Sequence, residues 1–150
     1  MSGVAQYRKS GPRTFTPGAN IRGGRVVEPH ATAGRIQEAG AGSVRWLGVA
    51  LTDAQSPDAV VTGPVVGGDG RPVTAMYSLP ITVAVADGGI EVKVTYAANA
   101  AFGDRLICAA NGTVTPAGAN PDARTIVGKC TEPMGVVVAT NPRGLMETAL

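Results

Sequence analysis

The same pattern of short strands and small turns occurs twice in this chain of 150 residues. The first copy spans residues 24–54 and the second spans residues 103–133. In each copy a glycine opens a short apolar strand, a second glycine starts a strand of alternating polar and apolar residues, and a turn containing Ala-Gly-Ala follows. Each copy closes on an apolar residue and a glycine, Leu47-Gly48 and Val127-Gly128. Because the match concerns strands and turns rather than reactive side chains, it predicts a scaffold that presents a surface.

Glycine and proline interrupt the chain throughout, and this favours β-structure. The 21 Gly and 11 Pro exceed a fifth of the sequence, against about 12% in an average protein. Between them lie short runs rich in valine, and no longer stretch combines a helical period with helix caps. Only 4% of the residues are aromatic, which suits thin sheets better than a deep core. We therefore expect an all-β fold, a small β-barrel or β-sandwich-like domain with an internal duplication.

The predicted organisation is an arm, one domain and a tail. Residues 1–20 show no useful period and contain two turn signals, so we expect an extended N-terminal arm. Residues 21–140 form the single all-β domain, in which strands and a hairpin over residues 60–96 join the two modules. We assign residues 141–150 to a C-terminal tail, in which residues 141–144 form a turn and residues 145–150 (LMETAL) either form a short helix or lie flat on a neighbour.

The strongest local pattern lies at the centre of the chain. Apolar residues alternate with small or polar ones over residues 81–86 and again over residues 90–96, and Asp87-Gly88-Gly89 separates the two runs. Two strands of period two around an Asp-Gly turn predict a β-hairpin with one buried face and one wet face. Residues 135–139 (GVVVA) predict a last strand.

Residues suited to catalysis or metal binding are sparse. The only histidine, His30, lies beside Pro29 next to a turn, where a solvated or packed imidazole is expected. The Gly-Gly-Asp-Gly sequence at residues 67–70 lacks the Lys-Ser/Thr pair and the following helix of a phosphate-binding loop. The aspartates are isolated in turns, where they cap the backbone. We expect no catalytic, cofactor-binding or metal-ligating residues, and the chain is not predicted to be an enzyme.

Charge and cysteine usage limit the compartment and the partners. A net charge of +2 with 16% charged residues is too mild for a nucleic-acid-binding surface. No apolar run approaches the ~20 residues of a membrane span, and the polar N-terminus lacks the apolar core of a signal peptide. We expect a soluble protein made in a reducing cytoplasm, with no nucleic-acid or membrane partner. Cys108 and Cys130 are expected to be buried free thiols, although a bridge between them remains open.

Two features could contact a partner. The basic residues of the arm either form a solvated tail or dock on an acidic neighbour, because a terminus stays disordered unless it is tied down. Trp46 is either a core residue or an interface anchor; its counterpart in the second module, Ile126, favours the core.

The repeated pattern resembles the small head-decoration (capsid cement) proteins of tailed bacteriophages. The resemblance rests on Gly24-Arg25-Val26-Val27 through Leu47-Gly48-Val49-Ala50, and on Gly103-Asp104-Arg105-Leu106-Ile107 through Gly112-Thr113-Val114 to Ile126-Val127-Gly128. It covers residues 20–140. The second closing strand departs from the pattern because it reads Val-Gly-Lys-Cys, without the alanine of the first.

The resemblance implies a structural virion protein that binds the outside of an icosahedral capsid. Such proteins often assemble as trimers and bridge neighbouring subunits of the major capsid protein. Exposed strand edges could add to a partner's sheet. The alternatives are another virion structural protein or a generic β-barrel binding module, such as a tail or baseplate component or a carbohydrate-binding accessory. The predicted interface residues are Tyr7, Arg8, Lys9, Arg13, Phe15, Trp46, Leu145, Met146 and Leu150.

Overall fold

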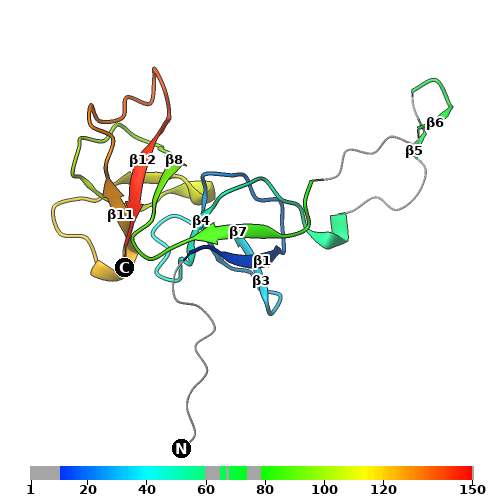
Figure 1. Cartoon of the computed structure of the whole chain (residues 1–150), viewed down its shortest axis with the longest axis horizontal. Helices are drawn as coiled ribbons and strands as arrows, with labels where there is room; N and C mark the ends of the chain where they lie inside the picture. The colour runs from blue at the N-terminus through cyan, green and yellow to red at the C-terminus, as the bar shows by residue number, and fades with distance from the viewer. Residues whose placement is uncertain (1–10, 60–64, 67, 74–78, 150) are drawn as a thin grey trace, which may run out of the picture.

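The chain folds into a closed five-stranded β-barrel followed by a second five-stranded sheet, whose outer strands are joined by a single bridge and which we call the C-terminal barrel (Figure 1). The computed structural model describes residues 11–59, 65–66, 68–73 and 79–149. The strands of the N-terminal barrel close in the order β1-β3-β2-β4-β7. Their bounds are β1 Arg13–Pro17, β2 Val26–Pro29, β3 Arg35–Glu38, β4 Gly48–Ala50 and β7 Val83–Ala86. The predicted all-β class is confirmed.

The C-terminal barrel repeats this strand arrangement. Its five-stranded sheet has the order β10-β9-β11-β12-β8, and a parallel bridge between Tyr96 and Val114 joins the two outer strands. The bounds are β8 Glu91–Thr95, β9 Arg105–Cys108, β10 Val114–Pro116, β11 Ile126–Cys130 and β12 Arg143–Thr148. Three short 3₁₀ turns complete the described structure: η1 Pro57–Ala59, η2 Ala110–Gly112 and η3 Ala123–Thr125.

Strand registers show that the duplication extends to the whole barrel. Val27 lies opposite Gly48 on β4, and Leu106 lies opposite Gly128 on β11. The outer strands agree as well, because Phe15 pairs with Val83 in one barrel and Val94 pairs with Gly144 in the other. The repeat therefore comprises five strands, of which the sequence pattern captured the middle three.

A glycine on each closing strand lets the last strand approach closely. A Cβ atom on Gly48 would lie 2.3 Å from the Ala86 carbonyl oxygen, and one on Gly128 would lie 2.3 Å from the Glu147 carbonyl oxygen. Contacts this short exclude every other residue unless the strands separate. The repeated apolar-Gly step in the sequence thus has a physical cause: barrel closure needs a residue without a side chain.

The two barrels differ in what covers their outer faces. Val27 points into the N-terminal core with Ile36 and Val85, whereas its neighbour Val26 and the cross-strand Val49 pack against the core of the C-terminal barrel. The positions equivalent to Val26 and Val49 in the C-terminal barrel are Arg105 and Lys129, which face each other across β9 and β11 and are exposed. One barrel thus buries this face against its twin, and the other presents it to solvent.

Backbone hydrogen bonds join the barrels directly. The Gly112 amide donates to the Ala39 carbonyl at 2.8 Å, and the Gly42 amide donates to the Cys108 carbonyl at 2.9 Å. Glu28 holds the loop that makes these contacts, because its carboxylate accepts from the Gln37 side chain, the Gly40 amide and the Ser43 hydroxyl. Burial acts to raise the pKa of Glu28, but the hydrogen bonds outweigh it and the net pKa lies below its ordinary value.

The predicted central hairpin is wrong. β7 lies between β1 and β4, and β8 pairs with β12. The alternating faces belong to different cores, since Val83 and Val85 are buried in the N-terminal barrel while Val94 and Tyr96 are buried in the C-terminal one. Asp87-Gly88-Gly89 is the crossing between barrels; both glycines adopt positive φ, at 72° and 79°.

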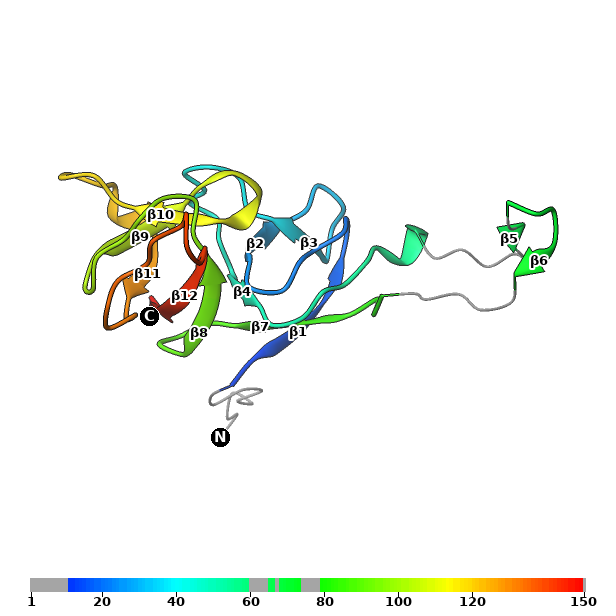
Figure 2. The ribbon, with the colours of Figure 1, turned by 90° about the horizontal axis from the view of Figure 1, so that it is seen from above.

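The predicted ends of the domain also need correction. Part of the arm, residues 13–17, is the barrel strand β1, and most of the tail is β12, at the centre of the sheet between β11 and β8. Residues 135–139 form no strand; only Val136 bridges to Ala100. Of the strands expected over residues 60–96, those that precede the hairpin lie largely outside the described residues. A two-stranded hairpin of β5 Val65–Val66 and β6 Pro72–Val73 is described, apart from both barrels (Figure 2).

Candidate partner-binding surface

The described residues hold no constellation typical of catalysis. No three His, Cys, Asp or Glu side chains of the described part lie close enough together to bind a metal ion. The Nδ1 atom of His30 accepts a hydrogen bond from the Thr32 amide at 3.0 Å, so it serves a local turn. No described helix has the length and hydropathy needed to cross a membrane.

Both cysteines are buried free thiols. Burial, and to a smaller extent the charge of Glu28, raise the pKa of Cys108 to about 12, which keeps the thiol protonated and a weak nucleophile. In the antiparallel pair β9–β11, Leu106 lies opposite Gly128, so Cys108 and Cys130 lie at opposite ends of the pair. Four residues of strand separate them, roughly 13 Å, which exceeds the reach of a disulfide.

The predicted contact residues of the arm are described only in part. Tyr7, Arg8 and Lys9 lie outside the described residues. Arg13 is exposed on β1, where its guanidinium forms an ion pair with Asp87 at 2.5 Å and lies 5.7 Å from the centre of the Phe15 ring. Phe15 is half-buried and packs against the N-terminal core. These contacts tie β1 to the start of the crossing between the barrels.

The predicted contact residues of the tail lie in or beside the C-terminal core. Met146 is fully buried, which is at odds with its expected role at an interface. Leu145 is half-buried, and its carbonyl accepts a hydrogen bond from the Tyr96 hydroxyl at 2.8 Å. Leu150 lies outside the described residues. The alternation that places Met146 inside follows from β12 being a central strand.

Trp46 lies where the two barrels meet. Its ring is half-buried against the C-terminal core cluster, and its indole N–H donates to the Arg124 carbonyl at 3.3 Å. Arg124 belongs to η3 of the C-terminal barrel. The core interpretation of Trp46 is therefore favoured by its contacts, which span the chain's own barrel–barrel interface.

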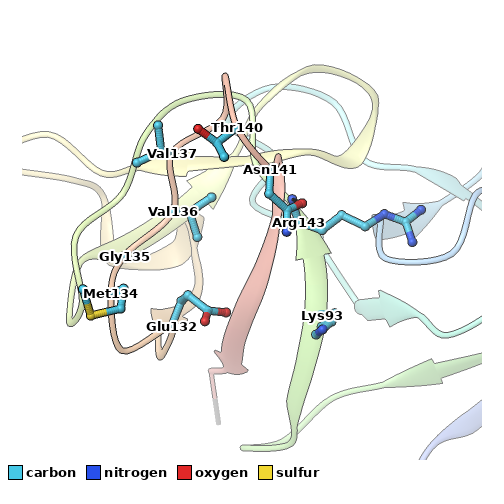
Figure 3. A pocket seen from close by; sticks show the side chains of 9 residues that line it. All are labelled: Lys93, Glu132, Met134, Gly135, Val136, Val137, Thr140, Asn141 and Arg143. Atoms are coloured by element: carbon cyan, nitrogen blue, oxygen red, sulfur yellow. Dashed lines mark hydrogen bonds between the residues drawn. The ribbon is translucent and has the colours of Figure 1, made fainter.

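A surface feature that the sequence did not indicate lies beside β8 and β12 (Figure 3). Two adjacent hollows, of about 330 and about 400 Å³, share the exposed cations Lys93 and Arg143. We call the two hollows together the β8–β12 groove. Residues 132, 134–137, 140 and 141 line one hollow, with Met134 and Val137 on the side away from the cations. Residues 23–24 and 50–53 line the other.

Strand pairing places Lys93 and Arg143 on the same face of the sheet. Arg143 lies opposite Thr95, and Lys93 lies opposite Leu145, so the two cations are diagonal neighbours on one face of the β8–β12 pair. Arg25 lies nearby. Burial lowers the pKa of Arg25, and the neighbouring guanidinium of Arg22 lowers it further. Arg143 acts in the same direction. Local sequence gave no signal for this cluster, because its members come from segments far apart in the chain.

Comparisons with known proteins place the fold. No protein-family model and no curated protein matches this chain. Among solved structures, the N base of head fiber gp8.5 of bacteriophage phi29 matches with a TM-score of 0.55 and 15% identity, over 92% of this chain and 92% of that chain. The C-terminal fragment of phi29 gene product 12 matches with a TM-score of 0.49 and 17% identity, over 93% and 98%. The predicted resemblance to a phage head protein is confirmed at the level of the fold: this chain has, over almost its whole length, the fold of the base of a phage head fiber.

Proposed function

We propose that this chain is a structural protein of a tailed-phage virion that binds the outside of the icosahedral capsid and stabilises it by bridging major capsid protein subunits. The observation that carries the proposal is the match to the head fiber base, which covers 92% of both chains and includes both barrels. The protein would be made in the host cytoplasm and reside on the capsid exterior.

The described chemistry supports a binding role. The thiols are buried, the histidine serves a turn, and no metal-ligating cluster occurs among the described residues. Closure leaves no strand of the N-terminal barrel with an open edge, and a bridge between Tyr96 and Val114 joins the outer strands of the C-terminal one. Strand addition to a barrel edge, which the sequence had suggested, is therefore not the mode we propose; capsid contacts would come from the loops and the insertion between β4 and β7.

Stabilisation would follow from mass action. A protein that binds the assembled shell and not free subunits shifts the equilibrium toward the shell, and the shift grows with occupancy. A homotrimer at a three-fold position would contact three capsid subunits at once, and linked contacts bind far more tightly than single ones.

The test has two steps. Light scattering of the purified protein distinguishes a monomer of 15.1 kDa from a trimer of about 45 kDa, three times that mass. Co-sedimentation with capsids that were assembled without this protein then measures binding. We expect saturable binding to capsids, a trimer in solution or on the capsid, and a higher melting temperature of the decorated particles. A protein that leaves capsids undecorated at saturating concentration would refute the proposal and favour a tail, baseplate or carbohydrate-binding role.

A further inference from the structure

The cations of the β8–β12 groove have no ion-pair partner in the described structure. Arg22 makes bidentate contacts with Glu38 at 3.0 and 3.1 Å. By contrast, no ion pair within 4.0 Å joins Lys93 or Arg143 to any described carboxylate. Arg25, beside them, donates to the Asn111 carbonyl at 3.2 Å. Three positive charges thus lie at or beside one groove without an ion pair to a described carboxylate.

The two carboxylates that line the groove, Glu132 and Asp53, accept hydrogen bonds from the backbone. Glu132 is half-buried, and its Oε2 atom accepts from the Leu145 amide at 3.1 Å. Asp53 accepts from the Gly23 amide at 2.7 Å. Both carboxylates thus bond backbone amides and form no ion pair with Lys93 or Arg143. The positive charge of these two side chains stays available to a ligand.

The fold does not require these cations. The registers of the two barrels make Thr14 the equivalent of Lys93 and Thr82 the equivalent of Arg143. The N-terminal barrel closes with an uncharged threonine at both places, although its outer strands pair in the same way. Charge at these positions is a property of the C-terminal barrel alone, as expected of a binding feature.

The opposite wall of the groove is apolar. Met134 is 93% exposed and Val137 is 51% exposed, in the loop between β11 and β12. Figure 3 shows Met134, Val136 and Val137 on one side of the hollow and Lys93 and Arg143 on the other. A solvent-exposed methionine across from cations without an ion-pair partner fits a ligand that carries both carboxylates and apolar groups.

We propose that the β8–β12 groove binds an extended, acidic segment of a partner protein, whose carboxylates meet Lys93 and Arg143 while an apolar side chain packs on Met134. In an extended segment, successive side chains point to opposite sides, so alternating acidic and apolar residues match the two walls. The exposed apolar wall at Met134 and Val137 favours a polypeptide over a nucleic acid, because a polypeptide can place an apolar side chain there. The inference rests on the proposed function in one respect: that function identifies the partner as a capsid subunit.

The probe is a fluorescein-labelled heptapeptide, Gly-Asp-Leu-Asp-Leu-Asp-Gly, and binding to the full chain is read by fluorescence anisotropy. The matched peptide Gly-Asn-Leu-Asn-Leu-Asn-Gly removes only the charge. We expect the acidic peptide to bind more tightly, and its affinity to fall as NaCl is raised from about 50 to about 500 mM.

Two double variants locate the site. K93Q/R143Q should weaken the acidic peptide at least tenfold, or about 1.4 kcal/mol, because both cations of the groove are lost. R105Q/K129Q removes the same charge from exposed positions on the other barrel face and should stay within about twofold of the original protein. M134A should weaken both peptides to a similar extent. All these side chains are exposed, so circular dichroism should confirm unchanged folding.

Several outcomes would overturn the inference. Equal affinity for the acidic and the neutral peptide would remove the role of charge, and equal losses in the two double variants would mean that only net charge matters. A single-stranded oligonucleotide that bound more tightly than the peptide, and lost affinity in K93Q/R143Q, would replace the polypeptide by a nucleic acid. Peptide binding without capsid binding would refute the proposed function and leave the groove assignment standing. Capsid binding that K93Q/R143Q leaves unchanged would support the proposed function and refute the role of the groove in it.

Discussion

Replacing Gly128 with alanine should destabilise the protein by about 3 kcal/mol, the upper end of the cost of overpacking. The added Cβ would lie 2.3 Å from the Glu147 carbonyl oxygen, and 2.8 Å from the Met146 Cγ atom. Cβ atoms essentially never approach other atoms within 3.0 Å, so β11 and β12 must separate by at least about 0.7 Å. The obstacle is backbone, which cannot rotate away as a side chain can.

The size of the effect can be checked by urea and thermal unfolding, followed by circular dichroism and by the fluorescence of Trp46. In a chain of this length, 3 kcal/mol corresponds to a drop in Tm of roughly 6–12 °C. Gly118→Ala is the matched control, because its Cβ would meet nothing within 4 Å; it should change stability by less than about 0.5 kcal/mol.

Gly48→Ala extends the same test to the N-terminal barrel. Its Cβ would also lie 2.3 Å from a carbonyl oxygen, that of Ala86, and Gly48 has a φ of +145° that other residues rarely adopt. The loss should therefore exceed that of Gly128→Ala. If Gly128→Ala were as stable as Gly118→Ala, the closing strand could shift at no cost, and the explanation of the repeated glycine would be refuted.

Three further predictions concern single groups. Glu28→Gln should remove part of the acid sensitivity of folding: a folded-state pKa below the ordinary 4.5 gives stability that is present above that pH and lost as pH falls through the folded value. The variant's urea midpoint should change less below pH 4.5 than that of the original protein, and parallel curves would contradict this. Tyr96→Phe should cost about 1 kcal/mol, because the buried hydrogen bond from the Tyr96 hydroxyl is lost while the Leu145 carbonyl keeps its bond from the Thr131 amide; a loss below about 0.3 kcal/mol would show that the bond is dispensable. Cys108 and Cys130 should react with Ellman's reagent at about pH 8 only after unfolding in urea, since both are buried and Cys108 has a pKa raised to about 12; rapid labelling of the native protein would contradict this.

The sequence predicted the parts of the fold that local pattern determines. The strands at β2, β3, β9 and β10, with the glycines around them, follow from spacing alone, and so does the all-β class. The pairing of strands that lie far apart in the sequence could not be predicted from local pattern. Alternation over β7 and β8 shows that each strand has a buried face, but it does not say that the two faces belong to different cores.

The remaining errors share that cause. The first and last strands of each barrel, RTFTP with VAVA and EVKVT with RGLMET, have little sequence in common, so the repeat ended at its middle three strands. Assigning residues 141–150 to a tail then concealed the β8–β12 pair. Lys93 and Arg143 become neighbours only through that pair, and the groove could not be found before it was known.

The tandem barrels give one chain the layout of a dimer without the equivalence that a dimer imposes. Two identical subunits must carry every substitution twice, whereas here each barrel diverges by itself. One copy accepted the insertion of residues 51–82 between its last two strands and turned the Val26–Val49 face inward; the other kept a shorter connection over residues 131–142 and a charged outer face at Arg105 and Lys129. A single polypeptide can in this way offer two unlike surfaces at a fixed spacing.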